Sequence, residues 1–192
     1  MSVIEVNKLT PLANNGTITL GDSGDTFSIP SGVTLSNAGT ATGFGKIGQV
    51  LQQEYATAAA MSATSYADNG QTLAITPSAT SSKILVMVET QIQIYGNGNN
   101  SNFGGRWKIV RTPAGGSAAD AFVNPDTMLR LNNTHDGQAY LMDRLNITHL
   151  DSPSTTSAVT YKIMQQATTT NILITSQIGS GKSKLTLMEV LA

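Results

Sequence analysis

Residues 179–183 (GSGKS) end like a phosphate-binding loop, in which backbone amide groups and a lysine hold the phosphates of a nucleotide. The first glycine of that motif would fall at Ser176, and residues 184–191 read as a strand rather than as the helix that such a loop requires. We therefore expect a glycine-rich hairpin turn between the last two strands, with its lysines in solvent, and no cofactor.

Two histidines lie near acidic residues, a pairing that serves metal binding and acid–base catalysis. They are His135 beside Asp136 and His149 near Asp151. No third ligand is clustered with them, so we interpret them as a turn histidine and a strand-end histidine. The chain has no Gly-x-Ser-x-Gly elbow, and most of its twelve acidic residues lie in turn-like segments. The sequence thus predicts no catalytic residue, no metal site and no enzymatic activity.

The run Arg106-Trp107-Lys108, with Arg111 close by, could stack on and neutralise a nucleic acid. Strand alternation instead places Arg106 and Lys108 on an outer face and Trp107 inside with Ile109. The whole chain has 11 Lys and Arg against 12 Asp and Glu, so no net positive field attracts a polyanion or an anionic bilayer. We expect a core tryptophan under a basic rim, and neither a nucleic-acid nor a membrane partner.

The composition indicates an all-β protein. Charged residues make up 12% of the 192 residues, and Thr, Ser and Asn are plentiful. Cysteine is absent, which excludes disulfides and thiolate metal sites. The first residues lack the basic and apolar regions of a signal peptide, and the longest aliphatic block, residues 84–88, is too short to span a bilayer.

Residues 46–192 form the expected main domain, a sandwich or jelly roll of seven or eight antiparallel strands. Residues 83–95 are the clearest strand, with alternate apolar residues on one face. Further expected strands are residues 71–76, 106–111, 139–150, 158–166, 172–178 and 184–191. Residues 46–60 fit both a helical face and a strand alternation, and we favour the strand.

Two polar connections, residues 96–105 and 112–126, read as loops that could touch a partner or a receptor. The candidate contact residues in them are Asn97, Asn99, Asn100, Phe103 and Phe122.

Residues 17–45 read as three or four short strands closed by glycine-containing turns. Their apolar pairs are Ile18 and Leu20, Phe27 and Ile29, and Val33 and Leu35. Burying six such side chains yields roughly 9 to 18 kcal/mol, against about 1 to 2 kcal/mol of backbone entropy for each ordered residue. We therefore expect this stem to be ordered only by copies of itself or by a host surface.

Residues 1–16 are expected to be a docking arm, because a short alternating stretch is followed by turn formers. Its apolar candidates are Val3, Ile4, Val6 and Leu9.

Residues 21–35 (GDSGDTFSIPSGVTL), followed by residues 40–46 (TATGFGK), resemble a segment of fibre-like and decoration-like structural proteins of tailed bacteriophages, especially marine and cyanobacterial ones. Residues 50–52, 75–78, 81–86, 150–156 and 185–190 are similar to the C-terminal β domain that accompanies this stem. The resemblance implies a homotrimer with an intertwined β stem, a jelly-roll-like knob and no catalytic residues. This chain has no large anchoring domain before its stem, and residues 15–43 reach at most about 95 Å when extended.

We therefore expect a non-enzymatic virion protein, synthesised in the host cytoplasm, that decorates or cements the capsid or forms a head fibre as a short homotrimer. The alternative is a tail fibre that contacts the host receptor, and outside the virion class a carbohydrate-binding module. The expected partners are further copies of the chain, a major capsid protein or tail protein, and a host-surface glycan or protein.

Overall fold

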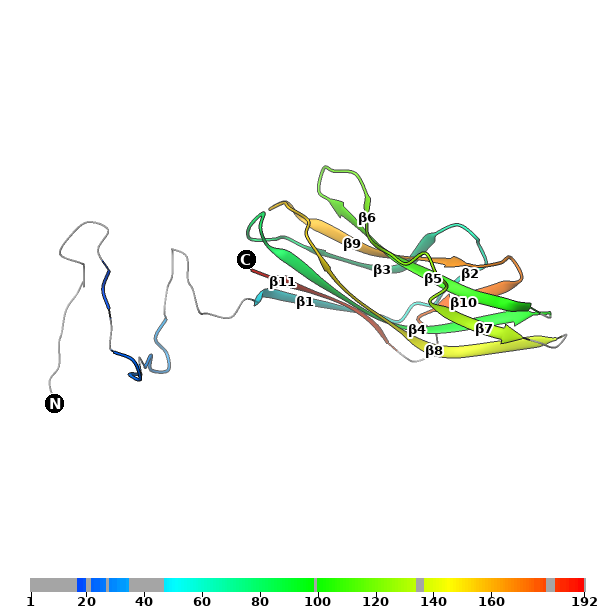
Figure 1. The fold of residues 1–192 in the computed structure, drawn as a ribbon, viewed down its shortest axis with the longest axis horizontal. Helices are drawn as coiled ribbons and strands as arrows, with labels where there is room; N and C mark the ends of the chain where they lie inside the picture. Colours follow the sequence, from blue (N-terminus) through cyan, green and yellow to red (C-terminus); the bar gives the residue numbers. More distant parts are fainter. Residues whose placement is uncertain are drawn as a thin grey trace. The chain divides into compact units, whose positions relative to one another are not determined.

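The computed structural model describes residues 17–19, 22–26, 28–34, 47–98, 100–133, 137–178 and 182–191 (Figure 1). The chain divides into two units, residues 1–44 and residues 45–192. Within the described residues there are eleven strands and no helix, and all of the strands belong to the second unit. The expected all-β class is confirmed.

The strands of the second unit form two antiparallel sheets. The first sheet contains β1 (Ile47–Tyr55), β2 (Ala59–Met61), β4 (Lys83–Asn97), β8 (Gln138–Asp151), β10 (Ile172–Ser176) and β11 (Ser183–Val190). The second sheet contains β3 (Ala67–Ile75), β5 (Asn100–Pro113), β6 (Ala119–Val123), β7 (Leu129–Asn133) and β9 (Val159–Ala167). The strand preferred for residues 46–60 is confirmed by β1 and β2.

Several strands follow one another along a single edge. β10 pairs with the second half of β4 and β11 with its first half, on the same side of β4. β1 and β2 continue each other along β11 and β10, and β6 and β7 share one edge of β5. The expected hairpin between the last two strands is therefore wrong. The chain leaves the ladder after Ser176 and returns to the same edge of β4 at Ser183.

Each sheet thus has four rows of strands, and the eight rows pair in a nested order along the chain. The first row (β1 and β2) pairs with the last (β11 and β10), and β3 pairs with β9. Inside these, β4 pairs with β8, and β5 pairs with β6 and β7. The described strands therefore follow the path of one long hairpin folded over into two layers.

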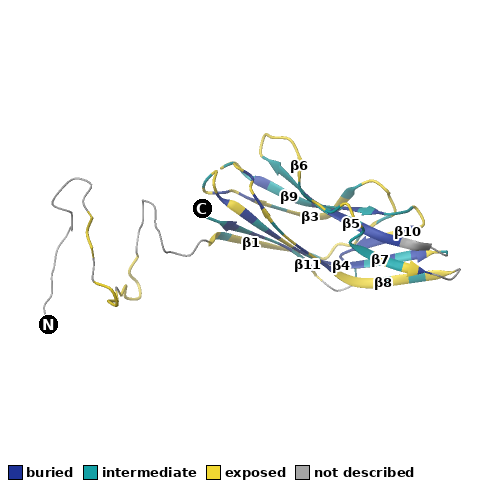
Figure 2. Ribbon diagram, viewed as in Figure 1, coloured by how far each residue is buried: buried dark blue, intermediate teal, exposed yellow. Residues whose placement is uncertain are grey.

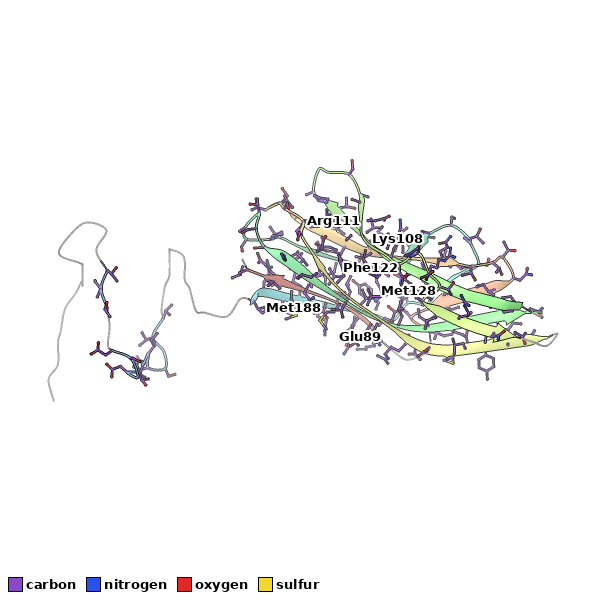
Figure 3. The ribbon with its side chains drawn as sticks, viewed as in Figure 1. Glu89, Lys108, Arg111, Phe122, Met128 and Met188 are labelled. Carbon is purple, nitrogen blue, oxygen red and sulfur yellow. The ribbon has the colours of Figure 1, made fainter. Side chains whose placement is uncertain are left out.

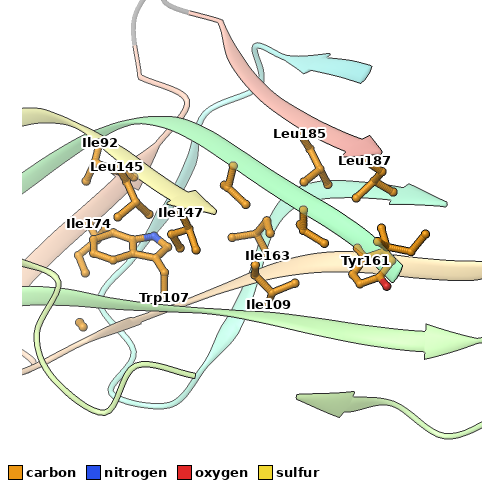
Figure 4. Packing of buried hydrophobic residues seen from close by; sticks show 14 of the residues in the cluster. Ile92, Trp107, Ile109, Leu145, Ile147, Tyr161, Ile163, Ile174, Leu185 and Leu187 are labelled. Carbon is orange, nitrogen blue, oxygen red and sulfur yellow. The ribbon is translucent and has the colours of Figure 1, made fainter. Parts of the chain in front are cut away.

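The core lies between the two sheets (Figure 4). As the alternation predicted, β4 turns its even-numbered aliphatic residues inward, where they meet Trp107, Ile109, Tyr161 and Ile163 of the second sheet. Trp107 and Ile109 are fully buried, which confirms the core tryptophan. Period-two alternation also sends the intervening residues of each strand to an outer face.

The two connections expected to be long loops are mostly strand. β4 extends to Asn97 and β5 begins at Asn100, so residues 96–105 are mostly strand, and the chain crosses from the first sheet to the second between them. Phe103 is 0% exposed, and a Cβ atom on Gly96 would lie 2.3 Å from the Phe103 ring. The prediction that Phe103 contacts a partner is therefore wrong, because the core already holds its side chain.

The second connection, residues 112–126, contains β6, which the sequence analysis did not predict. Phe122 lies in β6 rather than in a loop, half-buried against the core. Its ring centroid lies 5.5 Å from that of His149 on β8. Asn97 is exposed at the end of β4, and Asn99 lies outside the described residues.

In the first unit, the described residues form two turns and no strand. Asp25 N–H donates to Asp22 O (3.0 Å), and Val33 N–H donates to Pro30 O (3.2 Å). Gly24 and Gly32 supply the positive φ angles, 98° and 84°, that these turns need. None of the expected strands forms among the described residues of this unit, which have no neighbouring strand in the single chain to complete a ladder.

Three expected stem residues are exposed in the single chain: Ile18, Ile29 and Val33. The other predicted contact residues of this unit lie outside the described residues: Leu20, Phe27, Leu35, Val3, Ile4, Val6 and Leu9.

Candidate interaction surface

The motif resembling a phosphate-binding loop is only partly described, because residues 179–181 lie outside the described residues. Lys182 Nζ lies 2.5 Å from Glu54 Oε2 at the exposed surface. The hydrogen bond and charge of Glu54 raise the pKa of Lys182, and Lys182 in turn lowers the pKa of Glu54. Ser183 opens β11, and its Oγ accepts a hydrogen bond from Gln91 N–H (3.1 Å). Both described residues of the motif thus have structural partners.

The acidic residue near His149 belongs to a buried cluster that joins the two sheets. Asp151 forms an ion pair with Arg111 of β5 and accepts a hydrogen bond from the Tyr161 hydroxyl of β9 (2.7 Å). Burial raises the pKa of Tyr161, and the hydrogen bond and charge of Asp151 raise it further. His135 and Asp136 lie outside the described residues. Among the residues that are described, no group of three His, Cys, Asp or Glu side chains could hold a metal ion.

The outer face of the second sheet is charged and internally paired. Lys108 Nζ lies 2.7 Å from Asp120 Oδ1 and 4.8 Å from the centre of the Tyr66 ring. Lys162 Nζ lies 2.8 Å from Asp68 Oδ2. Such a face is typical of a sheet surface that stays in water.

The outer face of the first sheet carries an apolar row across all four of its strand rows. Leu150 of β8 lies opposite Leu85 of β4, Leu85 opposite Met188 of β11, and Met188 opposite Val50 of β1. Val50 is 53% exposed and Leu150 46% exposed. We call these four residues the proximal row, because they lie near Ile47, where the second unit begins its first strand.

A second apolar row crosses the other end of the same face. Tyr140 of β8 lies opposite Tyr95 of β4, and Tyr95 lies opposite Leu173 of β10. Tyr140 is 70% exposed, and Met142, two residues along the same strand face, is 50% exposed. We call Tyr140, Tyr95 and Leu173 the distal row.

A polar belt separates the two rows. Arg144 Nη1 lies 3.7 Å from Glu89 Oε2, and Lys184 of β11 lies opposite both Glu89 and Glu54 in register. Figure 2 shows β1 and most of β8, which edge this face, in the colour of exposed residues. Figure 3 places Glu89 and Met188 on this side of the sandwich and Lys108 and Arg111 on the other.

The buried carboxylate of Glu189 fixes β1 beside the proximal row. It accepts hydrogen bonds from Ser78 N–H and O–H (both 2.6 Å) and from Gln49 Nε2 (2.8 Å). Burial alone would raise the pKa of Glu189, but the hydrogen bonds from Ser78 and Gln49 outweigh it and hold the pKa at about 2. Gln49 also donates to Thr76 O (2.7 Å). β1 is thereby tied to the connection between β3 and β4.

The contacts predicted from the sequence lie in the stem, the arm and the loops, and do not include the two rows. A signal was present in residues 138–151, where apolar residues occupy both strand faces. Tyr140, Met142 and Leu150 alternate with Leu145 and Ile147, which are buried. A strand with one face in water carries polar residues on that face, so two apolar faces indicate a second covered surface.

No helix among the described residues is long and apolar enough to cross a membrane. A scan against models of protein families finds no match to this chain, and a search of curated proteins finds none either.

Proposed function

We propose that this chain is a non-enzymatic structural protein of a bacteriophage virion, which acts as a short homotrimer on the particle surface. The observation that carries the proposal is the outer face of the first sheet, where two apolar rows cross a surface that an isolated sandwich would keep polar. Contiguous exposed apolar surface of this kind marks an interaction site. The outer face of the second sheet, whose charged side chains are paired, is the face that we expect to stay in water.

The rows can contribute a substantial association energy. Completing the burial of a half-exposed aliphatic side chain contributes ~1 kcal/mol. The proximal row and its neighbour Met87 therefore supply a few kcal/mol per copy, and the distal row adds to this. The polar belt between them favours one placement of a partner, because a misplaced copy would bury the Glu89–Arg144 ion pair against apolar side chains.

Chain connectivity favours further copies of this chain as the occupant. One residue separates the end of the stem at Gly45 from Ile47, a span of at most ~7 Å. Where three stems wind together, the Ile47 residues of all three copies lie near one axis. We expect the proximal row, whose Val50 lies three residues along β1 from Ile47, to take part in the contacts between the copies. The bodies in turn keep the stems at a high local concentration, which offsets their ordering cost.

We infer that the sandwich is a jelly roll, because nested pairing of eight rows is the result of rolling one long hairpin into two sheets. Jelly rolls build many viral capsid and lectin domains. Jelly rolls also serve many other functions, so the proposed function depends mainly on the outer face of the first sheet.

Two positions on the particle fit such a trimer. A short stem and a docking arm favour a capsid decoration or cement protein, or a head fibre, bound to a major capsid protein. A tail appendage that touches a host-surface glycan or protein is the alternative. The number of copies in purified particles separates them, since decoration requires hundreds of copies and a tail appendage only a dozen or two.

The surface argument is tested by a pair of lysine substitutions. Val50→Lys places three like charges beside the proposed axis, and we expect it to convert the trimer to a monomer at micromolar concentration. Val123→Lys is the matched control, because Val123 is 44% exposed and lies beside Lys108 on the outer face of the second sheet. Light scattering gives the mass of each variant. Two variants with the same mass would contradict the proposal.

The stem makes a separate contribution. Replacing Phe27 and Ile29 by Ala is expected to loosen the trimer without unfolding the body. Unchanged assembly of that double variant would show that the stem is not part of the interface.

A further inference from the structure

A hollow adjoins the distal row on the side of strand β10. Its volume is about 460 Å³, which is within the range of sites that hold small ligands. The residues that line it come from the end of β4, from the start of β10 and from the turn before β10: Tyr95, Asn97, Thr170, Asn171, Ile172 and Leu173. Within the second unit, β10 lies at the end opposite the start of β1 (Figure 1). Contacts between copies near Ile47 therefore leave this hollow open.

The register of the first sheet brings these residues together on its outer face. Leu173 lies opposite Tyr95, and Asn97 N–H donates to Asn171 O (3.4 Å). β2 pairs only with the last three residues of β10, so none of the described strands covers the edge of β10 beside the hollow. The hollow thus opens to solvent in the single chain.

Three polar side chains at the hollow are exposed: those of Asn97, Thr170 and Asn171. None of the three forms a hydrogen bond with another described residue. Each carboxamide offers two donors and a carbonyl oxygen, and the threonine hydroxyl offers one donor and two acceptor sites. A ligand that enters from solvent can reach all three groups.

The other lining residues are apolar. Leu173 is 41% exposed, Tyr95 is half-buried and Ile172 is buried beneath them. Tyr95 supplies an aromatic ring, whose face is partly negative and attracts the C–H groups of a ligand. The hollow therefore combines an aromatic and aliphatic base with carboxamide and hydroxyl groups.

This combination defines the class of ligand. The residues that line the hollow carry no charge, so a charged ligand finds no counter-charge there. A purely apolar ligand would cover the two carboxamides without bonding to them, which is costly. A second protein would have to present matched polar groups to three separate side chains. A sugar ring meets these demands more simply, because it has C–H groups on its faces and adjacent hydroxyl groups around its rim.

We propose that this hollow binds a pyranose ring of a neutral saccharide. One face of the sugar lies against Tyr95 and Leu173, and its hydroxyl groups bond to Asn97 and Asn171. At each carboxamide, one hydroxyl donates to Oδ1 and the adjacent hydroxyl accepts from Nδ2–H, so that a vicinal diol satisfies both atoms.

As the contact point for a host-surface glycan, this site rests on the proposed function, but its binding chemistry needs only one chain. Tyr140 lies on the other side of Tyr95, on β8, and is 70% exposed. It stays available for contact with a further copy while the β10 side of the distal row holds the sugar.

The test uses the full chain and a panel of neutral monosaccharides at millimolar concentration. The panel contains glucose, galactose, mannose, fucose, N-acetylglucosamine and N-acetylgalactosamine. Saturation-transfer NMR detects a bound sugar, and light scattering of the same sample gives the mass of the protein. We expect at least one sugar to receive saturation, most strongly at the C–H groups that face Tyr95.

Three variants locate the sugar. Asn171→Ala removes an exposed carboxamide and should weaken binding about tenfold through the loss of its hydrogen bonds. Tyr95→Leu keeps an apolar side chain, removes the aromatic ring and should also weaken binding. Asn146→Ala is the matched control and should bind normally, because Asn146 is an exposed asparagine opposite Glu89 in the polar belt, outside the hollow.

Two results would overturn the proposal. In the first, no sugar of the panel receives saturation. In the second, Asn171→Ala and Tyr95→Leu bind a sugar as tightly as the unchanged chain, which would place the saccharide elsewhere. The mass separates this proposal from the proposed function. A monomer that binds a sugar at the hollow would support the site and contradict the trimer, whereas a trimer that binds none would contradict the site alone.

Discussion

Glu189 makes the stability of the sandwich depend on pH in a way that one substitution can isolate. Hydrogen bonds from Ser78 and Gln49 lower the pKa of its carboxyl group from 4.5 to about 2 in the folded chain. A lowered folded-state pKa stabilises the protein at pH values above the unfolded-state pKa. That stabilisation is therefore complete above about pH 4.5 and is lost as the pH falls towards 2. The drop in pKa corresponds to ~3 kcal/mol.

The substitution Glu189→Gln keeps the shape of the side chain and removes the charge. The new amide nitrogen would face the Ser78 N–H or the Gln49 Nε2–H, which are both donors, so it cannot accept the bond that a carboxylate oxygen accepts there. We expect the free energy of unfolding of the variant to be about 3 kcal/mol lower than that of the unchanged chain at pH 7. Because protonation imposes the same loss on the unchanged chain, the difference should approach zero at pH 2.

The assay is urea unfolding at fixed protein concentration between pH 7 and pH 2, followed by tryptophan fluorescence. Trp107 is the sole tryptophan and is fully buried, so its emission reports the core directly. Glu89→Gln is the matched control: its exposed ion pair with Arg144 spans 3.7 Å and is worth under about 1 kcal/mol. A Glu189→Gln difference that is the same at pH 7 and pH 2, or that is absent at pH 7, would refute the reasoning.

Two further pairs of variants test the core and the link between the sheets. Gly105→Ala should lower the free energy of unfolding by ~1–3 kcal/mol in thermal melts, because its Cβ atom would lie 2.2 Å from the tryptophan ring. Gly116→Ala, whose Cβ atom would have no neighbour closer than 3.4 Å, should change little, and equal losses would contradict the packing. Arg111→Met leaves the buried Asp151 without its cation and should cost about 3 kcal/mol in urea unfolding. Arg144→Met removes an exposed ion pair and should cost under about 1 kcal/mol, so a similar cost for both would argue against a buried link.

The parts of the fold that alternation governs could be predicted from the sequence. Aliphatic residues at every second position predicted β4 and its inner face, and the same rule placed Trp107 in the core. The rule of alternating apolar and polar residues gave the wrong inner face where polar side chains point inward. Asn69 and Gln71 of β3 are fully buried because they bond to each other, and such internal pairing cannot be read from residue type.

The pairing of strands that lie far apart in the sequence was the second feature that could not be predicted. A run of turn formers after Ser176 reads as a hairpin, yet the chain returns to the same edge of β4, and only the register shows this. The apolar rows are likewise assembled across strands: the proximal row takes one residue from each of four strands, and the distal row takes one from each of three.

Sedimentation equilibrium of the unchanged chain at micromolar concentration tests most directly whether the outer face of the first sheet is covered by further copies of itself. One chain has a mass of 20.1 kDa, so the account predicts a single species of three times that mass. A stable species of 20.1 kDa, with the proximal and distal rows open to solvent, would contradict it.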